Sequence, residues 1–127
     1  MTILDTHALI WWAAEPKKLS VRARRAIEQA DVLGVCAISC WEVAMLVQKG
    51  RLELDRDVKV WLKQALALPK IELLPLTVEV AARAAAFESF HGDPADRLII
   101  ATREIERAQL VSKDEQMRSD KRVAALW

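Results

Sequence analysis

Four acidic residues stand where their carboxylates could share one metal ion. Asp5 and Asp114 each close a short apolar run, and Glu42 and Asp96 each fall in the expected first turn of a helix. Carboxylates held close together raise one another's pKa and resist ionising at the same time, and a divalent cation removes that conflict. Oxygen ligands suit the hard ions Mg²⁺ and Mn²⁺. Such an ion holds a phosphate oxygen and activates water, so the pattern predicts phosphodiester hydrolysis.

Most of these acids also have a purely local interpretation. Glu42 is the last residue of a capping box that begins at Ser39. Asp96 favours the positive end of a helix dipole, and Asp114 can cap a short helix that follows it. Asp93, directly before a proline, is interpreted as an N-cap. The joint placement of the four acids, rather than any one of them, therefore supports a site.

Other reactive side chains form no recognisable constellation. Cys36 and Cys40 lack the spacing of a zinc site, and with only two histidines we interpret them as small buried hydrophobes. No Ser-His-Asp or Cys-His pairing is evident. Arg97 could contact a phosphate or pair with a neighbouring acid. Lys113 could line a groove for RNA, and His7 could touch substrate or bond to a helix start.

The segments that would position the acids alternate between strand and helix. Strands are expected at 2–4, 32–36, 71–74, 110–113 and 123–127, and helices at 6–14, 21–30, 39–49, 58–68, 77–90, 94–108 and just after 114. Helices of this length provide the crossovers that parallel strands need. We therefore expect a three-layer α/β/α sandwich around a mainly parallel sheet. Ligands bind beyond the carboxyl ends of such strands, which is where the acids should meet.

Composition limits the class of protein. The 127 residues form one expected domain, 1–127, and 53% hydrophobic residues with only 3 Gly and 4 Pro exclude collagen-like and disordered chains. The longest charge-free stretch, 32–41, is about half a membrane span, and Asp5 interrupts any signal-peptide core. We expect a cytoplasmic protein with no membrane contact. A net charge of +1 does not predict strong capture of a long nucleic acid.

The four acids lie in four sequence blocks, ILDTH (3–7), SCWE (39–42), DPADRLIIA (93–101) and LVSKD (110–114). These blocks resemble the motifs of PIN domains, and in particular of VapC-type toxins of toxin–antitoxin pairs. The resemblance implies a Mg²⁺-dependent endoribonuclease with Asp5, Glu42, Asp96 and Asp114 as catalytic acids. Asp5, Asp96 and Asp114 would hold the metal, and Glu42 would orient or bind through water. The last block departs from the usual Thr-x-Asp, because Ser112 replaces the threonine.

The resemblance also implies partners. They are an RNA substrate, a second copy of the chain, and a cognate antitoxin whose tail covers the active site. Trp11 and Trp12 are adjacent, so on a helix they point about 100° apart. We expect one in the core and the other on a dimer or antitoxin surface, where aromatic residues are enriched.

Three alternatives remain open at this level. A receiver-like domain also gathers acids at strand ends and carries a late lysine, which Lys113 imitates, but it needs adjacent acids after the first strand. A haloacid dehalogenase phosphatase needs Asp-x-Asp there, and His7 occupies the second position. A catalytically inactive interaction module would use the fold only for binding, and an intact set of four acids argues against it.

Overall fold

The computed structural model, which describes residues 1–87 and 92–127, contains a four-stranded parallel sheet in the order β3-β2-β1-β4. The strands are β1 (Thr2–Leu4), β2 (Leu33–Cys36), β3 (Ile71–Leu74) and β4 (Gln109–Val111). Leu4, at the end of β1, lies beside Val35 on one side and Val111 on the other. The carboxyl ends of the central strands therefore share one edge.

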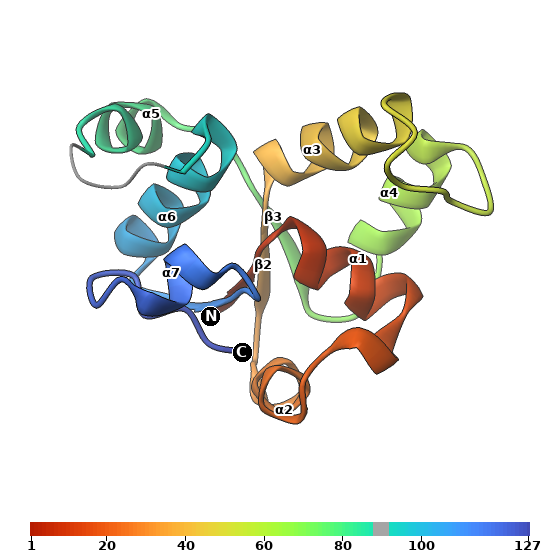
Figure 1. Ribbon diagram of the computed structural model, residues 1–127, viewed down its shortest axis with the longest axis horizontal. Helices are drawn as coiled ribbons and strands as arrows, with labels where there is room; N and C mark the ends of the chain where they lie inside the picture. The colour runs from red at the N-terminus through yellow and green to blue at the C-terminus, as the bar shows by residue number, and fades with distance from the viewer. Residues whose placement is uncertain (88–91) are drawn as a thin grey trace.

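Helices cover both faces of this sheet, as the sequence predicts (Figure 1). Helices α5, α6 and α7 lie on one side, α1, α2 and α4 lie on the other, and α3 continues directly from the end of β2. The helices are α1 (Thr6–Ala14), α2 (Val21–Gln29), α3 (Ala37–Gln48), α4 (Val58–Leu66), α5 (Val78–Ala85), α6 (Pro94–Glu106) and α7 (Glu115–Ser119), with a 3₁₀ turn η1 at Pro16–Lys18. The three-layer α/β/α fold is confirmed.

Successive side chains of β1 point to opposite faces of the sheet and so contribute to both layers of the core. Ile3 packs in a cluster with Ile99 of α6, and Leu4 packs in a second cluster with Leu9 of α1. All three residues of β1 are buried, because the strand is covered by helices on both faces. Burial of this short strand fixes where the chain emerges at the carboxyl edge, immediately before Asp5.

Several helix starts follow their sequence signals. The side chains of Ser20, Asp57, Thr77 and Asp93 each accept a hydrogen bond from the backbone N–H three residues on, as N-cap residues do. Pro94 occupies the first turn of α6, where its missing N–H costs nothing. These local signals set the start of α6 and therefore the position of Asp96.

One predicted helix start is wrong. Helix α3 begins at Ala37, not at Ser39, and its N-cap residue Cys36 makes no side-chain cap bond. Ser39 is fully buried within the helix, and its hydroxyl lies 3.0 Å from that of Thr6. Because a long-range polar partner replaces the local cap, Glu42 lies in the second turn of α3 and forms no capping box.

The later segments end earlier than expected. Helix α5 ends at Ala85, and residues 88–90 of the predicted helix lie outside the described residues. Strand β4 ends at Val111. The hydroxyl of the next residue, Ser112, donates to the Asp5 carboxylate and accepts from the Asp114 backbone N–H. The predicted strand at 123–127 is a single bridge between Val111 and Leu126, because the chain turns at Ala124 with a φ of 46°.

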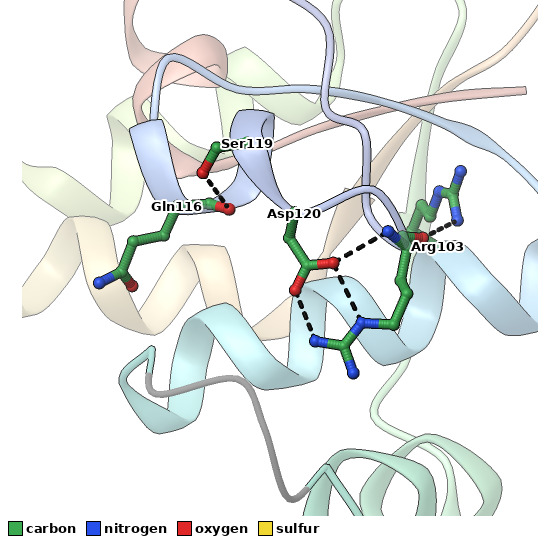
Figure 2. A network of polar contacts seen from close by, with 5 residues as sticks. Arg103, Gln116, Ser119 and Asp120 are labelled. Carbon is green, nitrogen blue, oxygen red and sulfur yellow. Dashed lines mark hydrogen bonds and ion pairs between the residues drawn. The ribbon is translucent and has the colours of Figure 1, made fainter.

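A polar network holds the C-terminal turn beside α6 (Figure 2). The Asp120 carboxylate accepts from the backbone N–H and the guanidinium of Arg122, and Arg103 of α6 donates to the Arg122 carbonyl at 3.3 Å. Ser119 donates to the Gln116 carbonyl at 3.5 Å. These bonds fix the end of α7, whose other end carries Asp114.

The remaining apolar predictions are confirmed in part. Cys36 is buried in the core and Cys40 is half-buried, and both are free. Trp11 and Trp12 are both half-buried against the same cluster, so the expected division into one core and one surface residue is wrong. Over the described ranges, no helix combines the length and apolar character that a membrane crossing requires.

Candidate metal centre

A cavity of about 510 Å³ lies at the carboxyl edge of the sheet. Its walls come from the starts of α1, α6 and α7 and from α3, and its lining residues are Asp5, Thr6, His7, Trp11, Glu42, Asp93, Asp96, Lys113 and Asp114. The fold thus brings all four predicted acids into one cavity and adds Asp93 to them. The predicted substrate contact, Arg97, is not in this lining.

Asp5 is the most buried of these acids, with 8% of its surface exposed. One carboxylate oxygen accepts from the backbone N–H of Ala8 at 2.8 Å and caps α1, and the other accepts from the Ser112 hydroxyl. Burial raises the pKa of Asp5, and these two hydrogen bonds oppose the rise. The carboxylate is therefore held in one orientation from two sides.

Glu42 reaches the cavity from the second turn of α3. The hydroxyl of buried Thr6, the residue after Asp5, donates a hydrogen bond to the Glu42 carboxylate. Partial burial raises the pKa of Glu42, the Thr6 bond lowers it, and the negative charges of Asp93 and Asp5 raise it further. The contact links α1 to α3 across the site.

Asp96 stands in the first turn of α6, as predicted, and its pKa is raised by its surroundings in the cavity. Burial, followed by the charges of Asp93, Glu42 and the two other acids of the cavity, raises its pKa to about 7. Without a compensating cation, the ionised form of this half-buried carboxylate is disfavoured, because four other acids share its cavity.

Asp93 was interpreted from the sequence only as an N-cap, and it does accept from the Asp96 N–H at 2.8 Å. It also lies in the site, because one oxygen from each of Glu42, Asp93 and Asp96 falls within 4.8 Å of the others. The signal that could have revealed this second role is its separation of three residues from Asp96. That separation places both acids on one face of the first helical turn.

Asp114 is exposed and caps α7 by accepting from the Met117 N–H at 3.0 Å, as its local interpretation predicts. Its own backbone N–H donates to the Ser112 hydroxyl oxygen at 3.0 Å. Ser112 is fully buried and also donates to Asp5, so one hydroxyl ties the two acids together. The retained hydroxyl of the last motif block therefore has a clear structural role.

Arg97 follows Asp96 in α6 but does not line the cavity. Its guanidinium donates to the backbone carbonyl of Phe87 and is half-buried. Among the residues that the structure describes, it forms no ion pair with an acid. In this arrangement it fastens α6 to the end of the α5 segment.

The family now follows from comparison with known proteins. Residues 2–122 match the family model of the PIN domain. The chain belongs to the PIN-domain family. This membership excludes the receiver and haloacid dehalogenase alternatives. It also confirms the resemblance that the four sequence blocks carry.

Individual relatives agree with this membership. The chain is 44% identical to Ribonuclease VapC22 of Mycobacterium tuberculosis, over 98% of this chain and 97% of that protein. It is similar in fold to VapBC2 from Rickettsia felis, solved with a promoter DNA fragment, with a TM-score of 0.71, 13% identity and coverage of 98% and 96% of the two chains. A toxin–antitoxin complex from Klebsiella pneumoniae has a TM-score of 0.67 at 16% identity, covering 96% and 94%. The 44% identical relative is a VapC ribonuclease, which agrees with the resemblance to VapC-type toxins found in the sequence.

The donor set of this PIN domain fits a hard divalent cation. Carboxylate oxygens from Glu42, Asp93 and Asp96 converge, and the buried carboxylate of Asp5 lines the same cavity. Burial, and after it the neighbouring carboxylates, raises the pKa of Asp96, and a divalent cation would favour the ionised form against both effects. Oxygen-only donors match the coordination preferences of Mg²⁺ and Mn²⁺.

Proposed function

We propose that this PIN domain is a Mg²⁺-dependent endoribonuclease that hydrolyses RNA phosphodiester bonds and acts as the toxin of a toxin–antitoxin pair. The observation that carries the proposal is the convergence of Asp5, Glu42 and Asp96 in one cavity. The 44% identity to a ribonuclease over nearly the whole chain supports RNA as the substrate. Mn²⁺ would serve in place of Mg²⁺, because both take oxygen ligands.

The acids divide into two roles in this proposal. Asp5, Asp96 and Asp114 would hold the cation, with Asp5 kept in orientation by Ala8 and Ser112. When bound, the cation supplies Lewis-acid polarisation of the phosphate and lowers the pKa of water. Glu42, oriented by the Thr6 hydroxyl, would position the attacking water and accept its proton.

The toxin role implies two protein partners. A cognate antitoxin would cover the acidic cavity, and two of the structurally similar proteins are toxin–antitoxin assemblies. A homodimer is proposed because the resemblance to VapC-type toxins implies one. Expression of the chain should arrest growth, and co-expression of the antitoxin should restore it.

The test is RNA cleavage by purified protein with Mg²⁺, with EDTA, and with an Asp5→Asn variant. Cleavage should require Mg²⁺ and disappear in chelator. The variant should also be inactive, because it lacks the negative charge that binds the metal. It should still fold, because its amide oxygen can accept the hydrogen bond from the Ala8 N–H. Asp31→Asn, at an exposed acid just before β2, is the matched control and should cleave normally. Cleavage that persists in EDTA or in Asp5→Asn contradicts the mechanism, and an inactive wild type with an intact fold favours the binding-module alternative.

A further inference from the structure

The acidic cavity has a second wall of different chemistry. His7, Trp11 and Lys113 line it together with the carboxylates. Among the described residues that line the cavity, Lys113 is the only lysine or arginine. None of these three side chains has a role in the metal chemistry proposed above.

The three side chains form one connected surface. The rings of His7 and Trp11 have centroids 5.6 Å apart and are tilted by 50°, and the Lys113 ammonium lies 5.6 Å from the Trp11 ring centroid. Trp127 packs edge-on against Trp11 at 5.5 Å from the other direction. His7 and Lys113 are exposed, whereas Trp11 is half-buried between two core clusters. The wall therefore combines a half-buried indole, packed against the core, with two exposed polar groups.

Core packing alone does not account for an aromatic residue facing this cavity. Trp12, the next residue, packs against the same core cluster as Trp11 but is absent from the cavity lining. Both indoles pack against that cluster, Trp11 also packs against a second one, and of the two only Trp11 lines the cavity beside the acids. This difference makes Trp12 a natural control for any role of Trp11.

We propose that the wall formed by His7, Trp11 and Lys113 binds an unpaired nucleotide next to the scissile phosphate. The base stacks on the aromatic rings, and the Lys113 ammonium moves from the Trp11 ring to a phosphate oxygen. Aromatic side chains stack on any base, and a nearby cation tracks the backbone, which is how proteins hold single-stranded nucleic acid. This inference rests on the proposed function and narrows the substrate to single-stranded or looped RNA.

Binding can be measured without cleavage in the Asp96→Asn background, by fluorescence anisotropy of a labelled single-stranded oligoribonucleotide pool of random sequence. Trp11→Leu should weaken binding roughly tenfold or more, the typical loss of one base–aromatic stack. Trp11→Phe should recover most of that affinity, His7→Ala should also weaken binding, and Trp12→Leu should leave it unchanged. A labelled RNA duplex of equal length should bind less well than the single strands and be insensitive to Trp11→Leu. The melting temperatures of the Trp11→Leu and Trp12→Leu variants show whether either substitution lowers the stability of the fold.

Exposed His7 keeps the test decisive if Trp11→Leu fails to fold. Unchanged RNA affinity in His7→Ala and in a folded Trp11 variant overturns the proposal. Equal losses in Trp11→Leu and Trp12→Leu also overturn it, because packing would then explain both. If the wild type cleaves RNA, and the same wall substitutions made with Asp96 intact match it in KM, the proposed function stands and only this inference falls. A wild type that neither binds nor cleaves RNA overturns both.

Discussion

Replacing Asp96 by asparagine should stabilise the metal-free protein while abolishing RNA cleavage. Burial and the neighbouring carboxylates raise the pKa of Asp96 from 3.8 to about 7. By proton linkage, a rise of this size corresponds to roughly 4 kcal/mol of unfavourable free energy for the ionised group. The carboxylate is only half-buried, and screening by water reduces the expected gain in the variant to about 1–2 kcal/mol.

The pH dependence of this gain has a definite sign. Between about pH 4 and pH 7 the folded wild type retains the Asp96 proton that the unfolded chain releases. Stability of the wild type therefore falls as the pH rises through this window and levels off above it. The Asp96→Asn variant has no such proton, so its advantage grows from pH 4 to pH 7 and is constant at higher pH.

Thermal unfolding in EDTA measures the effect. At pH 8 the variant should melt roughly 3–8 °C above the wild type, with a smaller difference at pH 5. Mg²⁺ should stabilise the wild type more than the variant, and so reduce or reverse the difference between their melting temperatures. Asp31→Asn, at an exposed acid, should melt like the wild type both in EDTA and with Mg²⁺. A variant that melts below the wild type at pH 8 in EDTA would show that Asp96 is a structural acid and refute the reasoning.

Two further substitutions test the packing that supports the site. Ser112→Ala removes the hydroxyl that donates to Asp5 and accepts from the Asp114 N–H, and should cost about 1–3 kcal/mol in urea unfolding. An unchanged midpoint would show that water replaces the hydroxyl. Gly34→Ala, in the centre of the sheet, would place a Cβ 2.8 Å from Leu74 Cδ1 and 3.1 Å from Ile3 Cγ1, and should cost about 1–3 kcal/mol. Wild-type stability in that variant would mean that the Leu74 side chain moves aside freely.

The parts of the site that could be predicted rest on local signals. Asp5 closes a buried strand, and Asp93 followed by Pro94 starts α6 and so fixes Asp96 within its first turn. These signals act within a few residues, through capping bonds and the backbone limits of proline. Parallel topology then brings the ends of β1 and β4 together, which made the shared edge predictable.

Glu42 shows where local reasoning fails. A capping box predicted its place in the first turn of α3, but Thr6, which is 36 residues away, bonds to its carboxylate. Ser39, the expected cap, is buried beside the same threonine. A long-range hydrogen bond in a buried environment is worth more than an exposed cap, so tertiary contact shifted the helix start.

The α/β class, the family motifs and the four candidate acids could be predicted from short segments, because strand and helix periodicity and capping chemistry are local. Packing of distant segments placed Asp93 beside those acids, joined Asp5 to Asp114 through Ser112, and paired Arg97 with the Phe87 carbonyl. It also placed Trp11 rather than Trp12 in the cavity wall. Such contacts join residues as far as 107 positions apart, and their geometry exists only after the helices pack on the sheet.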